Sequence, residues 1–261
     1  MAWIDCGVNL PAAEAIDDFK VMLDEASHAG VGRFVLIATN VDESHRAVEF
    51  AEQDARCIVT VGIHPHQAAQ APADFVAQLK DLAQHPRVRA IGECGLDFNR
   101  NFSPPDVQRQ VFAAQLEVAI DAQLPVYLHE RDALDEQLRL LRPAIDKLPG
   151  AFTHCFTGGG AALAAYQELG CYIGVTGWVC DERRGHELAQ AVPSIDAQRL
   201  LLETDAPYLL PRTLKPRPKS RTNHAKYVPH IGAHVANLRG ASVVELAAST
   251  SVNATRLFGA W

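Results

Sequence analysis

The sequence predicts an α/β fold, a (β/α)8 barrel of the TIM type. Eight short apolar runs alternate with segments of helix length along the chain, which is the pattern of eight strand–helix units. Ligand-type side chains also follow four of these runs directly, at the strand ends where such barrels carry their functional groups. A doubly wound sheet would more often open with a glycine-rich turn, whereas the first run, AWID, leads into CGVN.

The first half of the chain contains four of the predicted strands. They are the apolar runs AWID, RFVLIAT, CIVTVGI and VRAIGE. The intervening segments predict helices over residues 13–28, 42–55 and 73–84, the second of them started by Asp42 with Glu43 in its first turn. The longest helix is expected to follow Pro104 and Pro105 and to run to about Ala122. Its segment QVFAAQLEVAIDA has apolar residues at three- and four-residue spacing.

The second half continues the alternation. Its predicted strands are PVYLH, GAFTHC, CYIGVT and RLLLETD, and its predicted helices cover residues 132–142, 161–169 and 182–192. Two further helices are expected over residues 225–238 and 243–258. We therefore expect one TIM-barrel domain over residues 1–261.

Composition is that of an ordinary globular protein. With 48% hydrophobic and 21% charged residues, and no apolar stretch of about eighteen residues, neither disorder nor a transmembrane helix is expected. The amino terminus MAWIDCGVN has no basic region followed by a long apolar core, so we expect a cytoplasmic protein. The six cysteines show no CxxC spacing and are interpreted as reduced core thiols.

Three ligand-type residues predict a metal site. Glu93, His129 and His154 end the fourth, fifth and sixth predicted strands, and neighbouring strands lie about 4.8 Å apart. One carboxylate and two imidazoles around a divalent cation leave positions open for water and a phosphate oxygen, as a catalytic site requires. Cys94 and Cys155 point to the opposite side of their strands, which argues against a zinc thiolate.

Asp205 ends the eighth predicted strand, beside the first. It is a candidate either to ligate a second ion or to orient and deprotonate the attacking water. His64 and His66 in GIHPH follow the third strand, and they are candidates either for contact with the metal or a phosphate or for structural capping. Arg131 is a candidate for a bidentate contact with a substrate phosphate, the alternative being a surface arginine at a helix start.

The charge distribution is uneven. The net charge is −7, yet no Asp or Glu occurs between Ala206 and Val244, and seven basic residues fall there: Arg212, Lys215, Arg217, Lys219, Arg221, Lys226 and Arg239. A basic patch beside a catalytic mouth is expected for a phosphate-rich ligand. The alternative is a solvated surface linker, since LPRTLKPRPKSRTN has the composition of one.

Five motifs carry a resemblance to a known family. VGIHPH, AIGECGLDF, LHERDA, THCFTG and LLETDAPYL, in this order and at these separations, resemble the TatD family of metal-dependent deoxyribonucleases over nearly the whole chain. The resemblance implies a barrel of the amidohydrolase type that hydrolyses phosphodiester bonds. It places Glu93, His129, His154 and Asp205 on metal positions and His64 on a substrate-side histidine.

Two departures from the family pattern are present. Most members carry an HxH pair after the first strand, where this chain has Gly7 and Asn9, as in the branch of the family that lacks the pair. Members commonly have an Asn-Glu-Pro segment near TNHAKYVPHI; Asn223 is retained there as a candidate substrate contact, but His224 and Ala225 replace the other two residues.

The predicted function is a divalent-metal-dependent nuclease, a 3′→5′ exonuclease on single-stranded DNA, with RNA as a further substrate. Mg²⁺ is the expected ion, with Mn²⁺ and Zn²⁺ as alternatives. Asp205, Glu93 and His64 are the catalytic candidates, and Arg212 and Lys215 the candidates for backbone contacts. The alternatives are an amidohydrolase acting on a cyclic amide or lactone and a non-catalytic barrel that binds metal or nucleic acid. No membrane and no obligate protein partner is expected.

Overall fold

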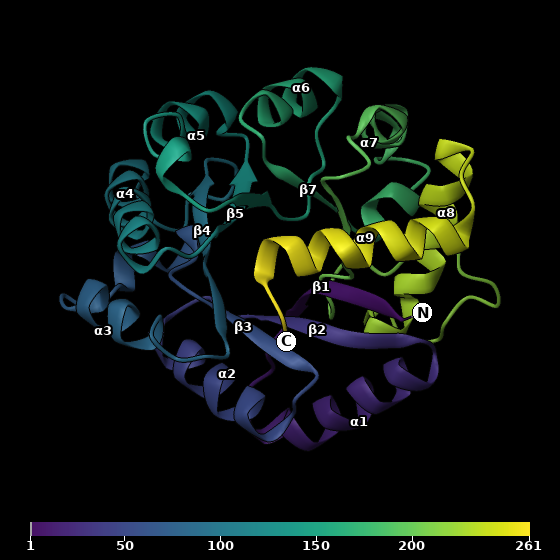
Figure 1. Cartoon of the computed structure of the whole chain (residues 1–261), viewed down its shortest axis with the longest axis horizontal. Helices are drawn as coiled ribbons and strands as arrows, with labels where there is room; N and C mark the ends of the chain where they lie inside the picture. The colour runs from purple at the N-terminus through teal and green to yellow at the C-terminus, as the bar shows by residue number, and fades with distance from the viewer. Residues whose placement is uncertain (1) are drawn as a thin grey trace. The chain divides into compact units, whose positions relative to one another are not determined.

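The computed structural model describes residues 2–261, and its eight strands alternate with helices (Figure 1). The strands are β1 (Trp3–Asn9), β2 (Val31–Ile37), β3 (Cys57–Val61), β4 (Val88–Asp97), β5 (Val126–Arg131), β6 (Ala151–Thr153), β7 (Tyr172–Val175) and β8 (Leu200–Leu202). They belong to one sheet in the order β1-β2-β3-β4-β5-β6-β7-β8. This is the strand order of a (β/α)8 barrel, so the predicted fold class is confirmed.

The helices occupy the expected segments with shifted ends. They are α1 (Ile16–His28), α2 (Val41–Gln53), α3 (Phe75–Leu82), α4 (Pro105–Ala122), α5 (Leu134–Leu141), α6 (Gly160–Glu168), α7 (His186–Ala191), α8 (Val228–Arg239) and α9 (Val243–Phe258). Short 3₁₀ helices are η1 (Ala13–Ala15), η2 (Pro65–Gln70), η3 (Ile145–Lys147), η4 (Gly177–Cys180), η5 (Val192–Ser194) and η6 (Ala225–Tyr227).

The chain groups into two compact units. The first comprises the residues up to Val35 together with Cys155–Gln167 and Ile173–Arg256. The second comprises Leu36–His154, Glu168–Tyr172 and Leu257–Trp261. Each unit is described by itself below.

In the second unit, parallel strands β3, β4, β5 and β6 pair in sequence order. Helix α2 packs on β3, α4 on β4 and α5 on β5 (Figure 1). The aromatic rings of Tyr127 and Phe152 meet edge to face, with centroids 4.9 Å apart, and both side chains are fully buried. Burial of these strands on both faces explains why their sequences are near-continuous apolar runs.

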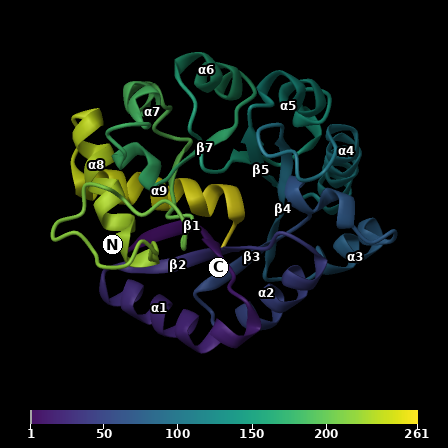
Figure 2. The same ribbon diagram turned by 180° about the vertical axis from the view of Figure 1, so that it is seen from behind.

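In the first unit, β7 pairs with β8, and β1 with the segment after β8 through Val8 and Ala206. Helix α8 packs on β1, where a side chain at Gly232 would lie 2.4 Å from the Trp3 ring. Glycine at position 232 therefore permits the close approach of the helix. Residues 203–224 run from β8 to η6 without a regular helix or a named strand, in the yellow-green segment of Figure 2.

Three local differences from the predicted elements have clear causes. Strand β4 extends past Glu93 to Asp97, because the residues from Cys94 onward pair with β5. Helix α2 begins after Asn40, whose side chain accepts a hydrogen bond from the Glu43 backbone N–H at 2.9 Å. The segment after His64 forms η2, a helix that apolar periodicity does not signal.

The cysteines form no disulfide within residues 2–261, and five of the six are buried. All six cysteines are free thiols, and only Cys155 is more than slightly exposed. Burial raises the pKa of the Cys94 thiol far above its usual range, so this thiol is inert as a nucleophile. Within residues 2–261, no helix is long and apolar enough to cross a membrane.

Candidate active site

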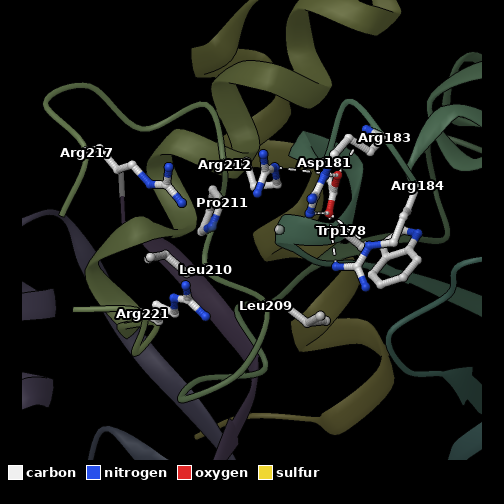
Figure 3. A pocket seen from close by; sticks show the side chains of 11 residues that line it. Trp178, Asp181, Arg183, Arg184, Leu209, Leu210, Pro211, Arg212, Arg217 and Arg221 are labelled. Carbon is white, nitrogen blue, oxygen red and sulfur yellow. Dashed lines mark hydrogen bonds and ion pairs between the residues drawn. The ribbon is translucent and has the colours of Figure 1, made fainter. Parts of the chain in front are cut away.

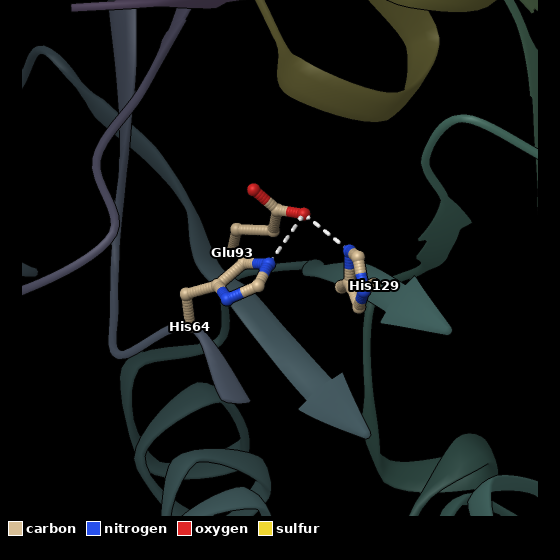
Figure 4. Close-up of side chains that lie close together, drawn as sticks. All are labelled: His64, Glu93 and His129. Carbon is tan, nitrogen blue, oxygen red and sulfur yellow. Dashed lines mark hydrogen bonds and ion pairs between the residues drawn. The ribbon is translucent and has the colours of Figure 1, made fainter. Parts of the chain in front are cut away.

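The Glu93 carboxylate is the centre of a histidine cluster in the second unit (Figure 4). Its Oε1 atom lies 2.8 Å from His129 Nδ1, 3.5 Å from His64 Nε2 and 3.9 Å from His154 Nε2. Glu93, His64 and His154 are each at most 8% exposed. The structure thus brings together three residues that the sequence predicted as metal ligands, and His64, predicted as a candidate for contact with the metal or a phosphate, lies beside Glu93.

Close backbone contact places Glu93 on β4. Gly92 has a φ of 148°, and a Cβ atom there would lie 2.2 Å from the Tyr127 carbonyl oxygen. A Cβ atom at Gly62 would lie 2.7 Å from Gly92. Only glycine fits these two positions, and their contact draws the backbones of β3, β4 and β5 together beside Glu93.

Glutamines from the helices hold the backbone next to the cluster. Gln115 of α4 pairs with both backbone groups of Ile63, the residue before His64: its Oε1 accepts from Ile63 N–H at 2.7 Å and its Nε2 donates to the carbonyl at 3.0 Å. Gln108 of α4 makes the same pair of bonds with Asp97, and Gln137 of α5 donates to the His129 carbonyl. All three glutamines are at most 1% exposed.

Asp97 is a member of the cluster that the sequence analysis missed. Its Oδ2 lies 2.6 Å from His66 Nε2 and 3.5 Å from His129 Nε2, and Asp97 itself is 2% exposed. The sequence did hold a signal, since Asp97 is four residues after Glu93 and shares its side of the strand. The signal was lost because the strand was predicted to end at Glu93.

Ionisation in the cluster follows from burial and neighbouring charge. Burial lowers the pKa of His64 to about 3, so this ring is neutral. Burial would also lower the pKa of His129, but the carboxylates of Asp97 and Glu93 raise it to about 9. Burial would raise the pKa of Glu93, but the surrounding histidines hold it below its usual range. Asp97 has a lowered pKa for the same reason.

His64 has two roles that the sequence left as alternatives. Its Nδ1 accepts a hydrogen bond from the His66 backbone N–H at 3.0 Å and so caps η2, while its Nε2 faces Glu93. The capping bond fixes the tautomer, with the proton on Nε2. His154 is oriented similarly, because its Nδ1 lies 2.8 Å from the Tyr127 hydroxyl and its Nε2 faces Glu93.

The cluster has the donors that a divalent cation needs. Ligand atoms of His64, Glu93 and His129 all lie within 4.8 Å of one another. Nε2 of His129 is buried and forms no hydrogen bond of good geometry within residues 2–261, although Asp97 Oδ2 lies 3.5 Å away; a further group could satisfy this nitrogen. Two imidazoles and a carboxylate suit Zn²⁺, Mn²⁺ and related ions, whereas the proton on Nε2 of His64 leaves that nitrogen without a lone pair for the ion. These residues fit a bound divalent cation.

Asp205 belongs to the first unit, where it begins a tight turn. The φ angle of Asp205 is 56°. The Asp205 backbone N–H donates to the Gly7 carbonyl, and the Asp205 carbonyl accepts from the Tyr208 N–H at 2.8 Å. The Asn9 amide donates to Asp205 Oδ1 at 2.8 Å. This turn and this amide fix the direction of the Asp205 carboxylate.

Two buried acids of the first unit, Asp5 and Glu203, accept hydrogen bonds from backbone N–H groups. Asp5 of β1 accepts hydrogen bonds from the Thr204 hydroxyl at 2.6 Å and from the Thr204 N–H at 2.8 Å, and burial raises the pKa of Asp5 to about 8. Glu203 is fully buried and accepts from the Cys155 backbone N–H at 2.5 Å. Glu203 therefore fixes the position of the Cys155 backbone.

The predicted substrate contacts have different surroundings. Lys215 is exposed, and the Arg131 guanidinium lies 3.9 Å from Asp132 with 41% of the side chain exposed. Asn223 is buried, and its amide bonds the Thr204 carbonyl and the His224 N–H. Its described contacts make Asn223 an anchor for the loop, while Arg131 and Lys215 remain candidates for substrate.

Five arginines line a pocket of about 360 Å³ in the first unit (Figure 3). They are Arg183, Arg184, Arg212, Arg217 and Arg221. Asp181 is the only carboxylate among the described lining residues, and its side chain is 4% exposed. It lies within 3.6 Å of the guanidinium groups of Arg183, Arg184 and Arg212. Arg184 also stacks on the Trp178 ring. Within residues 2–261, Arg217 and Arg221 form no ion pair, so their charge is available to an anion.

Arg212 is paired more strongly than the sequence suggested. Besides Asp181, it contacts Glu182, with Arg212 Nη2 3.0 Å from Glu182 Oε1. Both acids lie on the loop after β7, outside the acid-free segment. Part of the positive charge of that segment is therefore neutralised by a neighbouring loop.

Comparison with known proteins matches this architecture. The family model for TatD related DNase matches residues 4–259. A 3′-5′ ssDNA/RNA exonuclease TatD from Klebsiella pneumoniae is 49% identical over 98% of this chain and 97% of its own length, and the one from Escherichia coli K12 is 48% identical over 98% of both. A solved TatD homologue from Escherichia coli superposes with a TM-score of 0.90 at 26% identity, covering 99% of this chain and 98% of its own.

A more distant solved structure shares the fold alone. The phosphotriesterase homology protein from Escherichia coli, complexed with phosphate in its active site, has a TM-score of 0.66 at 14% identity over 98% of both chains. The family model spans almost the whole chain, and the curated relatives are nearly half identical to it. The chain therefore belongs to the family of TatD-related DNases.

Proposed function

We propose that this protein is a divalent-metal-dependent nuclease that removes nucleotides from the 3′ end of single-stranded DNA and RNA. The observation that carries the proposal is the buried Glu93 carboxylate with imidazole nitrogens of His129, His64 and His154 within 3.9 Å. The curated relatives from Klebsiella pneumoniae and Escherichia coli, named for this activity, support the substrate class and the polarity.

We assign Glu93, His129, His154 and Asp205 as metal ligands. A divalent ion held there, with Mg²⁺ as the proposed ion, would polarise the scissile phosphate and lower the pKa of bound water. Glu93, His64, His129 and His154 form the buried part of the site. The Tyr127 hydroxyl orients the His154 ring, and the η2 backbone orients the His64 ring. His64, neutral and buried, is proposed to contact the substrate side of the scissile group.

Asp205 is assigned to the attacking water. Its carboxylate is oriented by Asn9 and by the turn that it begins, which supports the proposal that it accepts a proton as the water attacks phosphorus. His66 is held by Asp97 and remains a candidate for a phosphate contact. Neither Asn9 nor Asp97 is assigned a contact with the reacting atoms; both are positioning residues.

The basic pocket is assigned to the strand's phosphates. Arg217 and Arg221 carry unpaired charge there, and Asp181 holds Arg183, Arg184 and Arg212 in place beside them. Pre-oriented guanidinium groups suit phosphate because they donate bidentate hydrogen bonds. An amidohydrolase acting on a small uncharged cyclic amide or lactone would gain nothing from this pocket.

A direct assay tests the function. End-labelled single-stranded DNA and RNA are incubated with the purified protein and Mg²⁺ or Mn²⁺, and a panel of cyclic amides and lactones is tested in parallel. We expect stepwise shortening from the 3′ end, which a 3′-end label reports as release of the labelled nucleotide and a 5′-end label as a ladder. Turnover of an amide without nuclease activity would support the amidohydrolase, and binding without turnover the non-catalytic barrel.

A further inference from the structure

We propose that Tyr208 and the apolar pocket beside Asp205 bind a nucleobase at the 3′ end of the strand, next to the phosphodiester that is cut. This inference rests on the proposed nuclease function and assigns a second kind of contact to the same substrate. It makes Tyr208 a specificity-determining residue of the first unit.

The Tyr208 ring is exposed to solvent. It is 61% exposed although its backbone belongs to a hydrogen-bonded turn, and a ring exposed beside an apolar pocket offers a face on which a base can stack. Its backbone N–H bonds to the Asp205 carbonyl at 2.8 Å, so the ring and the proposed water-binding carboxylate belong to one rigid turn. The Asn223 N–H bonds to the Pro207 carbonyl and holds the turn from its other side.

The pocket beside this turn is continuous with the Asp205 site. It measures about 480 Å³, and its wall includes Asn9, Ala206 and Pro207, the residues that bond or flank Asp205. Phe19 and Met22 of α1, together with Leu10 and Pro11, add apolar side chains to its lining. A group stacked on Tyr208 would therefore be connected by a short linkage to a phosphate at Asp205.

The charge of the pocket identifies which part of a nucleotide it takes. Of the described residues that line it, none is Lys or Arg, and Asp18 contributes an exposed carboxylate at the rim. The basic pocket around Asp181 has the opposite composition, and the two share no described lining residue. A phosphate would meet no guanidinium or ammonium group among the described lining residues here, but would meet five guanidinium groups in the basic pocket. A flat, uncharged base fits an apolar wall with an exposed ring.

Polar groups at the rim can meet the edge of the base. The Asp18 carboxylate can accept from an exocyclic amino group, and Thr222 offers a hydroxyl. Such rim contacts tolerate different bases, because the ring stacks on every base through its π-face. The pocket therefore recognises that a base is present rather than which base it is.

The test compares two substrates in wild-type and variant enzyme. One is a single-stranded oligodeoxythymidylate, and the other is the same oligonucleotide with an abasic tetrahydrofuran residue at its 3′ end. We expect wild-type kcat/KM to fall by about 5- to 150-fold on the abasic substrate, the range for the loss of one base–aromatic stack. Tyr208→Ala should lose a similar factor on the normal substrate and almost nothing further on the abasic one.

Three additional variants and one further substrate serve as controls. Tyr208→Phe keeps the ring and should retain wild-type preference for the base. Ala12→Trp places a large ring in the pocket from an exposed position and should abolish the preference, while Val244→Ala removes exposed apolar surface on α9 and should change nothing. An abasic residue at the 5′ end should leave wild-type kcat/KM unchanged, and thermal melting checks that each variant is folded.

The outcomes separate this inference from the function on which it rests. If the wild-type enzyme hydrolyses neither oligonucleotide, the proposed nuclease function has failed. If it hydrolyses both, and Tyr208→Ala loses activity equally on the base-bearing and the abasic substrate, Tyr208 acts without contacting the base and the inference is overturned. Equal wild-type cleavage of the two substrates would overturn it as well.

Discussion

The side-chain amide of Asn9 donates a hydrogen bond to Asp205, with Nδ2 2.8 Å from Oδ1. Asn9 occupies the position of the second histidine in the HxH pair that is typical of the family pattern. A histidine would offer a lone pair to a metal, whereas the amide offers its N–H to the carboxylate. The same position thus changes from a ligand to a positioning residue.

Replacement of Asn9 should therefore affect the rate more than metal affinity at the histidine cluster. We expect Asn9→Ala to lower kcat by about 10-fold or more, the scale of losing an outer-shell partner of a site carboxylate. Asn9→Asp should be worse, because a second negative charge would face Asp205. Steady-state kinetics with saturating Mn²⁺ measures both, and unchanged kcat in Asn9→Asp would contradict the assigned role.

Alanine substitution of the four proposed ligands should abolish most activity. Glu93→Ala, His129→Ala, His154→Ala and Asp205→Ala should each lower kcat/KM by at least about 100-fold while the protein stays folded. His45→Ala, which removes an exposed histidine from α2, is the matched control. Near-normal nuclease activity in His154→Ala would show that the site is assigned wrongly.

Charge reversal in the loop after β8 should weaken binding without slowing the chemistry. Replacing Lys215, Arg217 and Lys219 by glutamate should raise KM and reduce the slope of log affinity against log salt, by about 0.7 for each lost contact with a single strand. Turnover at saturation should change little. Lys147→Glu, on the exposed η3, is the control; an unaltered salt slope in the triple variant would make the loop an ordinary surface linker.

The free enzyme should hold one tightly bound ion. The cluster around Glu93 offers a carboxylate and buried imidazoles, but Gly7 has no side chain and the Asn9 amide is directed at Asp205. A second ion would depend on Asp205, water and substrate phosphates and should bind weakly, as hydrated Mg²⁺ often does. Metal analysis of the dialysed protein checks this, and two stoichiometric ions would mean that another side chain replaces the absent histidine pair as a ligand.

Asp181 should contribute to stability only while it is ionised. Burial alone would raise its pKa, but hydrogen bonds from the Arg183 backbone and from the Arg183 and Arg184 guanidinium groups bring the pKa to about 2, below the ordinary 3.8. The stabilisation is complete above the unfolded pKa and is lost as the pH falls from about 4 towards 2.

Asp181→Asn should therefore lower the free energy of unfolding at pH 7 by about 1–3 kcal/mol, the range for breaking hydrogen bonds to a charged group. The difference from wild type should shrink between pH 4.5 and pH 3. Urea unfolding at several pH values measures it. A difference that is constant over this range would mean that the carboxylate's charge is not what stabilises the loop.

The sequence was informative where a residue's role depends on its own strand. Glu93, His129, His154 and Asp205 follow apolar runs, and their positions next to strand ends follow from barrel geometry. Asp97 was missed because the end of β4 depends on pairing with β5, which no local pattern reports.

Side-chain contacts between segments that are distant in the sequence could not be predicted either. The pairing of Arg212 with Glu182, and the support of Thr204 by Asp5, join residues that are far apart in the chain. Periodicity and composition contain no information on such contacts. The exposure of Tyr208 is of the same kind, because an aromatic residue in an apolar run is expected to be buried until the fold leaves it uncovered.

The three buried glutamines of α4 and α5 have a consequence for transplanting or redesigning this site. A glutamine amide has the shape and polarity of a peptide group, so Gln115 and Gln108 present to Ile63 and Asp97 what one more β-strand would present. The outer helices thereby complete hydrogen bonding that the strands leave open. A designer who copies only strands and loops onto another barrel would leave these backbone groups without partners and the histidines poorly aimed, so the graft must include the helical turns that carry the glutamines.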